Sequence, residues 1–225
     1  MTEHGIEVRD LGTIPYRDAY ALQLDLFGRL LDSTRAGDPA PQGTLLLVEH
    51  PHVYTLGRHG HADNLLVGAD RLAARGIECV RIERGGDITY HGPGQLVAYP
   101  LISMRRYGLG VKSYIALLEE AVIRTLLTYG ITAGRVEDAT GVWIGIGTPR
   151  ERKICAIGVK CSRFCTMHGL ALNVNTDLSY FHAINPCGFT DKGVTSIAAE
   201  LGHPVDMQEL KHRFTDIFLS LLKPD

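Results

Sequence analysis

The segment that most constrains the fold of this chain is a glycine-rich run over residues 84–99. It reads RGGDITYHGPGQLVAY, so its glycines alternate with an arginine, an aspartate, a tyrosine and a histidine before an apolar stretch begins. Glycine permits positive φ and lets a ligand approach the main chain closely, whereas a flexible linker needs no such side chains at fixed places. A hairpin with a glycine bulge is the alternative. The HGPG sequence that follows favours a binding loop leading into a strand.

Hydrophobic periodicity elsewhere predicts both strands and helices. Short β-rich runs, bounded by glycine, proline or charged residues, predict strands over residues 44–48, 79–82, 96–102, 142–146 and 154–159. Apolar residues at helical spacing predict helices after Pro15 and over residues 70–74 and 113–127. This mixture predicts the α/β (α+β) class, with antiparallel or mixed strand pairing.

The sequence changes character after Asp177, and this change suggests how the chain is divided. A loop that contains Cys187 is followed by predicted helices over residues 196–201 and 206–222, the second with the spacing of a capping box at its start. A chain of 225 residues is long enough for one globular domain with a small addition. We therefore predict a main α/β domain over residues 1–177 and a small helical C-terminal lobe over 178–225, packed on that domain.

Charge and hydropathy exclude several classes of partner. The formal net charge is −2 and the longest basic run is Arg105-Arg106, so the electrostatic footprint of a nucleic-acid-binding protein is absent, although a local patch could still bind an acidic protein. The first ten residues lack the basic and apolar regions of a signal peptide, and no segment approaches the ~18 apolar residues of a membrane span. We expect a soluble, cytoplasmic protein with no nucleic-acid or membrane partner.

The cysteines indicate a reducing compartment. The chain has 5 of them, an odd number without the density of a disulfide framework. Cys161, Cys165 and His168 invite a metal interpretation, but a closed structural zinc site needs four ligands and no second cysteine pair is present. We therefore predict no metal site.

Two residues carry candidate chemistry. Cys187 lies between Asn185-Pro186 and Gly188, where the proline stiffens the chain and the glycine leaves room beside the sulfur. A thiol that merely fills a turn is the alternative. Lys153 begins the run KICAIGVK and, alone, is typical of a solvated charge at a sheet edge. Beside a cysteine, an ammonium group lowers the thiol pKa from its usual value of about 8.5, and a desolvated lysine can also act as base and then as acid.

His91 and His168 are further candidates because each precedes a glycine. Either could be a catalytic base, an orienting group or a core residue with satisfied hydrogen bonds. The sequence does not rank them.

Taken together, these segments resemble the lipoyl(octanoyl) transferase family, whose members move an octanoyl group from acyl carrier protein to a lysine of a lipoyl domain. The resemblance runs from about the first predicted helix to residues 194–196. The motifs that carry it are, in chain order, Arg84-Gly85-Gly86, Thr89-Tyr90-His91, Gly94-Gln95, Tyr99, Lys153-Ile154, Ile157-Gly158, His168-Gly169-Leu170-Ala171-Leu172-Asn173 and Pro186-Cys187-Gly188. The family shares its fold with lipoate- and biotin-protein ligases, so the resemblance implies a mixed sheet flanked by helices.

The resemblance also implies roles for individual residues. Cys187 would be the acyl-accepting nucleophile, and Lys153 would lower its pKa and shuttle its proton. Ile88, Ile157 and Leu170 are expected to form the slot for the acyl chain. The residues implied to bind the acyl substrate are Arg84, Gly85, Gly86, Asp87, Ile88, Thr89, Tyr90, His91, Ala156, Ile157, Gly158, Gly169, Leu170 and Ala171.

The implied reaction needs neither cofactor nor ATP, because a thioester is already activated. The implied donor is octanoyl-acyl carrier protein. The implied acceptors are the lipoyl domains of 2-oxoacid dehydrogenase complexes and the glycine cleavage H protein. The departures from the family pattern are mild: His52 stands where the family often has a proline, and Cys155, Cys161 and Cys165 add thiols near Lys153.

Three other functions are compatible with parts of this pattern. An ATP-dependent lipoate or biotin ligase would form an adenylate and would not need Cys187. A cysteine hydrolase would combine Cys187 with His91 or His168 and Asp177, and would release free octanoate. A catalytically silent protein could bind carrier or lipoyl domains, although it would have no reason to retain both Lys153 and Cys187.

Overall fold

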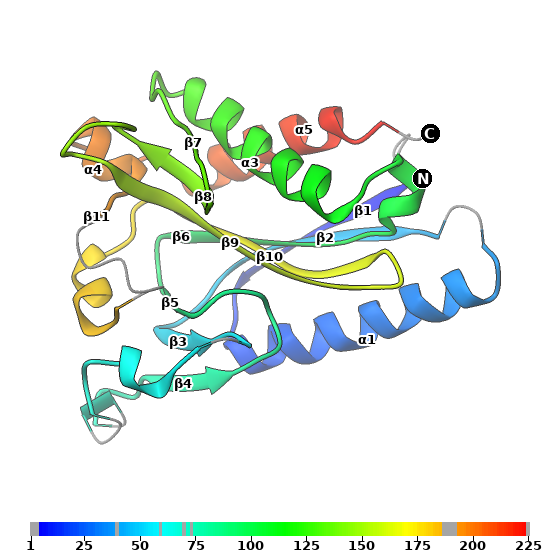
Figure 1. Cartoon of the computed structure of the whole chain (residues 1–225), viewed down its shortest axis with the longest axis horizontal. Helices are drawn as coiled ribbons and strands as arrows, with labels where there is room; N and C mark the ends of the chain where they lie inside the picture. Colours follow the sequence, from blue (N-terminus) through cyan, green and yellow to red (C-terminus); the bar gives the residue numbers. More distant parts are fainter. Residues whose placement is uncertain are drawn as a thin grey trace.

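The computed structural model describes residues 5–38, 41–58, 60–68, 71–72, 74–185 and 193–223. Its main element is an 8-stranded sheet in the order β1-β2-β6-β10-β9-β8-β7, with β11 paired to β9 (Figure 1). The strands in that order are β1 (Ile6–Thr13), β2 (Gly43–Glu49), β6 (Gln95–Leu101), β10 (Cys165–Asn173), β9 (Arg152–Ser162), β8 (Ala139–Ile144), β7 (Gly134–Val136) and β11 (Gly193–Val194).

A second sheet of 3 strands has the order β4-β3-β5. It consists of β4 (Glu78–Arg81), β3 (Val53–Leu56) and β5 (Ile88–His91). Parallel pairs (β1 with β2, β11 with β9 and β3 with β4) occur beside antiparallel ones. The predicted mixed sheet is therefore confirmed.

Helices cover both faces of the main sheet. Figure 1 shows α3 (Val111–Leu127) and α5 (Met207–Leu221) along one face, and α1 (Tyr16–Arg35) with the second sheet along the other. The remaining helices are short: α4 (Ile197–Leu201) and the 3-10 turns η1 (Ala62–Asn64), η2 (Met104–Tyr107) and η3 (Leu178–Ala183). The predicted α+β class with flanking helices is confirmed.

The burial of β6 on both of its faces explains why it lies inside the main sheet, between β2 and β10. All of its residues are buried. Leu96 and Ala98 enter the core beneath α3 and α5, whereas Val97 and Tyr99 enter the core beneath α1. Successive side chains of a strand point to opposite faces, so a strand that is buried at every position must be covered on both faces.

The segment after Asp177 shares the core of the main sheet. Ile197, Phe214 and Phe218 are fully buried in the same cluster as Tyr114 of α3. β11 pairs with β9 of the main sheet. Both helices predicted here are present, and the Asp206 carboxylate accepts the Glu209 N–H at 2.9 Å as an N-cap.

Several elements differ from the sequence expectation. The predicted strands include none of β1, β3, β5, β7, β10 and β11: β1 alternates weakly, β5 lies inside the glycine-rich run, and β7 and β11 have only 3 and 2 residues. The predicted helix over 70–74 falls partly outside the described residues. Within the part of the chain that the structure describes, no helix has both the length and the hydropathy needed to cross a bilayer.

Candidate active site

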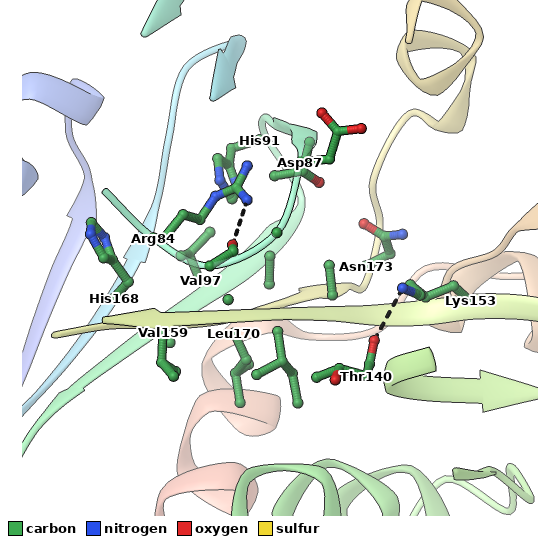
Figure 2. Close-up of a pocket in the computed structure, with 18 of the residues that line it drawn as sticks. Arg84, Asp87, His91, Val97, Thr140, Lys153, Val159, His168, Leu170 and Asn173 are labelled. Atoms are coloured by element: carbon green, nitrogen blue, oxygen red, sulfur yellow. Dashed lines mark hydrogen bonds between the residues drawn. The ribbon is translucent and has the colours of Figure 1, made fainter. Parts of the chain in front are cut away.

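A cavity of about 570 Å³ lies between the glycine-rich loop, β9 and β10 (Figure 2). It brings together segments that are far apart in the sequence. The predicted binding residues that line it are Arg84, Gly85, Gly86, Asp87, Ile88, Thr89, His91, Ala156, Ile157, Gly158, Gly169, Leu170 and Ala171. Lys153 lines the same cavity, and Figure 2 shows Lys153 and His168 at opposite ends of it.

Tyr90 is the predicted binding residue that does not line this cavity. It lies on β5 between cavity residues, and the alternation of the strand turns its side chain to the other face. There it is fully buried beside Tyr54, and its hydroxyl contacts His52 Nδ1 at 2.7 Å. The expectation that Tyr90 contacts substrate is not supported by this placement.

The glycine-rich loop crosses β9 closely, which explains why glycines are needed. Gly85 N–H donates to Val159 O at 3.0 Å. A Cβ atom on Gly158 would lie 2.8 Å from Gly85 O and 3.1 Å from Arg84 Cδ. Gly86 has a φ of +85°, which is costly for any residue with a side chain. The run is therefore a loop fastened across the sheet rather than a hairpin.

Small residues form the floor of the cavity on the side of this loop. In the β9–β10 pairing, Ala156 faces Ala171 and Gly158 faces Gly169. Such pairs leave space above the sheet that larger residues would fill. Ile157 and Leu170 form the pair between them and pack in the core with α3, and Figure 2 shows the Leu170 side chain on the face of the sheet away from the glycine-rich loop. Both predicted slot residues are among the residues that line the cavity, but their side chains pack in the core on that face.

The Arg84 side chain fastens the loop to the second sheet. It is only 8% exposed, and its Nη2 donates to Thr55 O at 2.6 Å and to Thr55 Oγ1 at 3.0 Å. Its Nη1 donates to Gly85 O at 3.0 Å, as drawn in Figure 2. Arg84 thus shapes the cavity wall through main-chain contacts.

A chain of hydrogen bonds fixes the tautomer of His91. Asn173 Nδ2 donates to the main-chain Thr195 O at 3.0 Å, so Asn173 Oδ1 accepts from Gln95 Nε2 at 2.9 Å. Gln95 Oε1 must then accept from His91 Nδ1 at 2.8 Å, which leaves Nε2 of this ring without a proton. Burial, with a smaller contribution from His50, lowers the pKa of His91 to about 3. The ring is therefore neutral.

His168 combines backbone strain with unsatisfied polar atoms. Its φ is +63°, its side chain is 2% exposed, and neither ring nitrogen has a hydrogen-bond partner among the described residues. Burial and, to a lesser degree, the Arg84 charge lower its pKa to about 3. The ring stacks on Tyr20 at 5.9 Å between centroids. A strained residue with buried unpaired nitrogens facing a cavity is typical of a ligand-binding position.

Asp177 does not form a hydrolase triad with His91 or His168. Among the described residues neither His91 nor His168 is hydrogen-bonded to a carboxylate. The Asp177 carboxylate instead accepts the Ser179 N–H at 2.9 Å and caps η3. A histidine general base needs a third group that orients it, and Asp177 does not serve here.

Lys153 lies near the start of β9 with its amine held at the cavity. Nζ donates to Thr140 O at 3.1 Å and lies 4.6 Å from the centroid of the Trp143 ring. The sequence did not single out Trp143, although it is the only tryptophan in the chain and falls on a predicted strand. The main-chain oxygen of Lys153 accepts the Thr195 N–H at 2.9 Å, which ties β9 to β11.

Cys187 lies outside the described residues, and of the described residues that flank it in the sequence, Gly193 and Val194 line the cavity. Before it, Asn185 N–H donates to Asn64 O at 2.8 Å. After it, Gly193 pairs with Arg152, the neighbour of Lys153, and lines the cavity.

The four cysteines that the structure describes are not candidates for the nucleophile or for a metal site. Cys79, Cys155, Cys161 and Cys165 are free thiols. Cys155 is fully buried and burial strongly raises its pKa, so it is no thiolate despite its nearness to Lys153. In the ranges that the structure describes, no cluster of histidine, cysteine and carboxylate residues could hold a metal ion.

Comparison with solved structures shows which fold this is. A bipartite lipoate protein ligase of Thermoplasma acidophilum superposes with a TM-score of 0.70 at 20% identity, covering 98% of this chain and 87% of that one. A lipoate-protein ligase A bound with ATP gives 0.68 at 18% identity, with the same coverage. A biotin protein ligase of Aquifex aeolicus with biotin and ATP gives 0.52 at 13% identity, covering 96% and 70%. These similarities establish the shared fold.

Comparison of sequences establishes the family. Residues 18–219 match the family model described as the lipoyl protein ligase A/B catalytic domain. An octanoyltransferase of Bacteroides fragilis is 54% identical over 213 residues, covering 95% of this chain and 96% of the relative. An octanoyltransferase of Bacteroides thetaiotaomicron is 55% identical over 204 residues, covering 91% and 89%. The chain therefore belongs to the lipoyl protein ligase A/B catalytic-domain family and, within it, to the octanoyltransferases.

Proposed function

We propose that this enzyme moves an octanoyl group from octanoyl-acyl carrier protein to a lysine of a lipoyl domain through a thioester on Cys187. The observation that carries this proposal is the position of Lys153, which lines a cavity that Gly193 and Val194, a few residues after Cys187 in the sequence, also line. Relatives about half identical in sequence are octanoyltransferases, and this identity favours acyl transfer over ATP-dependent ligation.

The chemistry follows from a cysteine beside an ammonium group. The Lys153 charge favours the thiolate of Cys187 over the thiol. The thiolate attacks the carbonyl carbon of the donor thioester, a C–S bond to Cys187 forms, the C–S bond to the carrier breaks, and the carrier sulfur takes up the proton that the Cys187 thiol had given up. The neutral amine of the acceptor lysine then attacks the acyl-enzyme, an amide C–N bond forms, the C–S bond to Cys187 breaks, and the proton that the amine loses passes to solvent as the Cys187 thiolate is regenerated. The thioester supplies the activation, so no nucleotide is consumed.

The remaining parts of the site would bind the acyl chain. The small residues Ala156, Gly158, Gly169 and Ala171 leave room beneath the glycine-rich loop for an unbranched chain. Main-chain N–H groups of this loop and of β9 are suitable donors to the oxyanion that forms during acyl transfer. The proposed acceptors are the lipoyl domains of 2-oxoacid dehydrogenase complexes and the glycine cleavage H protein, and the proposed location is the cytoplasm.

An adduct experiment tests the nucleophile. Incubation with octanoyl-acyl carrier protein is expected to add one octanoyl group to Cys187, which hydroxylamine removes. Cys187→Ser should lose this adduct, whereas Cys161→Ser, which alters an exposed thiol elsewhere, should keep it. An adduct that persists in Cys187→Ser would show that the nucleophile is another residue.

A pH profile tests the partner of the nucleophile. Lys153→Ala should raise the pH at which Cys187 reacts with an alkylating agent, because the thiolate loses the adjacent positive charge. Transfer of octanoyl to an added lipoyl domain should fall in the same variant. An unchanged alkylation profile would contradict the proposed coupling between the two residues.

A further inference from the structure

The cavity extends further along β9 than an octanoyl chain reaches. Lys153 lines one end, and His168, which lines the other end, pairs with Val159 of β9 (Figure 2). Lys153 and Val159 are six residues apart, which corresponds to roughly 20 Å along a strand. A fully extended octanoyl chain has seven C–C bonds of about 1.5 Å each, so it spans at most about 11 Å. The cavity at His168 therefore lies beyond an octanoyl chain that begins near Lys153.

His168 lines this cavity through a strained backbone. Leu170 of β10 packs in the core with α3, and strict alternation along the strand would place the side chain of residue 168 on that same face. His168 instead has a φ of +63°, and Figure 2 shows its ring on the opposite face of the sheet, together with Arg84 and His91. Strain of this kind persists only where the surrounding structure enforces it, and it is concentrated at ligand sites.

The ring is held in place without the use of its nitrogen atoms. The Tyr20 ring of α1 stacks on it, with 5.9 Å between centroids and 9° between planes. The main-chain N–H of His168 donates to Gln23 Oε1 at 3.1 Å. Neither Nδ1 nor Nε2 has a hydrogen-bond partner among the described residues, although the side chain is only 2% exposed. Buried polar atoms are costly to leave unpaired, so these two nitrogens require a partner from outside the chain.

The surroundings of His168 favour an uncharged partner. Burial and, to a smaller degree, the Arg84 charge lower the pKa of the ring to about 3, so it is neutral. A neutral imidazole has one N–H donor and one nitrogen acceptor. Charges of both signs lie nearby, from Arg84, Lys160 and Glu83. A carboxylate in the ligand would be repelled by Glu83, and an ammonium group by Arg84 and Lys160. A hydroxyl group, which both donates and accepts, matches the imidazole without a charge.

We propose that His168 forms a polar subsite at the far end of the cavity, and that this subsite binds a hydroxyl group at the distal end of an acyl chain longer than octanoyl. The inference rests on the proposed function, which puts the reacting carbonyl group at the Lys153 end. It assigns to the enzyme a second class of donor, the ω-hydroxyacyl thioester. The transfer step is unchanged: the thioester C–S bond breaks, the amide C–N bond forms, and the hydroxyl group takes no part.

The position of the subsite makes the effect of a hydroxyl group depend on chain length. Between the two ends, the floor of the cavity consists of the small side chains of Ala156, Gly158, Gly169 and Ala171. A hydroxyl group that ends over this floor loses its hydrogen bonds to water and gains none from these side chains, which costs about tenfold in binding. A hydroxyl group that reaches His168 recovers a hydrogen bond. The penalty should therefore be large for a short chain and small for a longer one.

The test compares each ω-hydroxyacyl chain with the unsubstituted chain of the same length. The full chain is supplied with acyl carrier protein that bears eight, ten or twelve carbons, with or without the terminal hydroxyl group. Transfer to an added lipoyl domain gives kcat/KM for each donor. The hydroxylated eight-carbon donor should be about tenfold poorer than octanoyl, whereas a hydroxylated ten- or twelve-carbon donor should equal its unsubstituted counterpart. The inference is overturned if the penalty is the same at all three lengths or if neither longer chain is transferred.

Variants at position 168 test whether the imidazole is responsible. His168→Phe retains a planar ring but no nitrogen atom, so the longer hydroxylated donors should become about tenfold poorer than their counterparts. His168→Asn tolerates a positive φ and keeps a donor and an acceptor, so the penalty should be smaller in this variant. Val97→Ala is the control, because it alters another wall of the cavity and should affect both members of each pair alike. The ratio within a pair cancels any general loss of activity, and circular dichroism confirms folding.

A spectroscopic measurement on the wild-type protein needs no variant. Nitrogen-15 NMR follows the His168 ring while the free twelve-carbon acid, with or without its terminal hydroxyl group, is added. The ring nitrogens should shift further with the hydroxylated acid. Equal shifts with both acids, or no binding of either, would contradict the subsite. If wild type transfers no octanoyl group to the lipoyl domain, the proposed function fails, and the NMR measurement still decides whether His168 binds a hydroxyl group.

Discussion

At the scale of single residues, the site depends on positions where no side chain fits. Gly158 lies where the loop that begins at Arg84 crosses β9, and a Cβ atom there would meet Gly85 O at 2.8 Å. The motif containing this glycine was evident in the sequence, but the crossing was not. A requirement for glycine that arises from a contact 73 residues away in the chain cannot be read from local spacing.

Gly158→Ala is expected to separate the glycine-rich loop from the strand. A displacement of about 1 Å in a substrate-binding wall costs on the order of 100-fold in rate, so kcat/KM for octanoyl transfer should fall between about tenfold and 100-fold. Overpacking should lower the free energy of unfolding by about 1–3 kcal/mol.

Gly28→Ala is the matched control for this change. Gly28 lies inside α1, where an added Cβ meets nothing within 4 Å, so the free energy of unfolding should rise by about 0.5–1 kcal/mol with no loss of activity. Equal losses of activity in the two variants would contradict the role of the crossing.

At the scale of elements, a buried ion pair holds the C-terminal helix α5 against the edge of the main sheet. α5 is joined to the edge strand β1 by an ion pair in which Lys211 is only 2% exposed, with Nζ at 2.9 Å and 3.1 Å from the Asp10 carboxylate oxygens. A buried ammonium is costly unless a partner compensates it. This pair therefore specifies where the C-terminal helix docks.

Asp10→Asn should be strongly destabilising, because it leaves the Lys211 charge buried without compensation. The expected loss in the free energy of unfolding, measured with urea, is about 3–5 kcal/mol. Lys211→Met should cost less, since the remaining carboxylate of Asp10 is partly exposed and can be solvated. Asp25→Asn is the control: its partner Arg29 has a side chain that is 73% exposed, so its loss should stay below about 1 kcal/mol. A similar loss in Asp10→Asn and Asp25→Asn would refute the buried pair.

At the scale of the whole molecule, folding brings together three histidines from separate parts of the chain: His91 and His168 line the cavity, and His50 contacts His91. His50 follows β2, His91 ends β5 and His168 lies in β10. Ring contacts join His50 to His91 at 5.9 Å, and both are buried. Burial is the main cause that lowers their pKa values, to about 4 for His50 and about 3 for each of the other two. All three are neutral in the folded protein.

These shifts predict how stability depends on pH. In the unfolded chain a histidine binds its proton near pH 6.5, whereas in the folded chain it does not until well below pH 5, so the unfolded state binds more protons in between. The stabilisation is therefore fully present above pH 6.5 and is lost as the pH falls. Between about pH 7.5 and 5.5 the free energy of unfolding should decrease by about 4 kcal/mol, from roughly 1.4 kcal/mol per histidine.

Urea unfolding at a series of pH values measures this loss. His168→Gln should reduce the decrease by about one third, because one of three titrating groups is removed. His203→Gln, at an exposed position, should leave it unchanged. Stability that does not vary over this interval would show that the three rings are not buried as neutral groups.

The sequence by itself determined the class of fold, the family and about half of the residues that line the cavity. Buried strands and amphipathic helices carry local periodicities, and the motifs at Arg84, Lys153 and His168 are contiguous, so neither needs a tertiary contact to be recognised. Only the tertiary structure decided that Tyr90 faces away from the cavity, that Trp143 lies beneath the Lys153 amine, and that His91 is held as one tautomer through Gln95 and Asn173. Each of these depends on strand register and on which face a side chain takes, and a shift of one residue reverses that face. The glycine-rich run thus predicts a binding loop from the sequence alone. The packing of this loop against β9 and β10 determines which residues line the cavity.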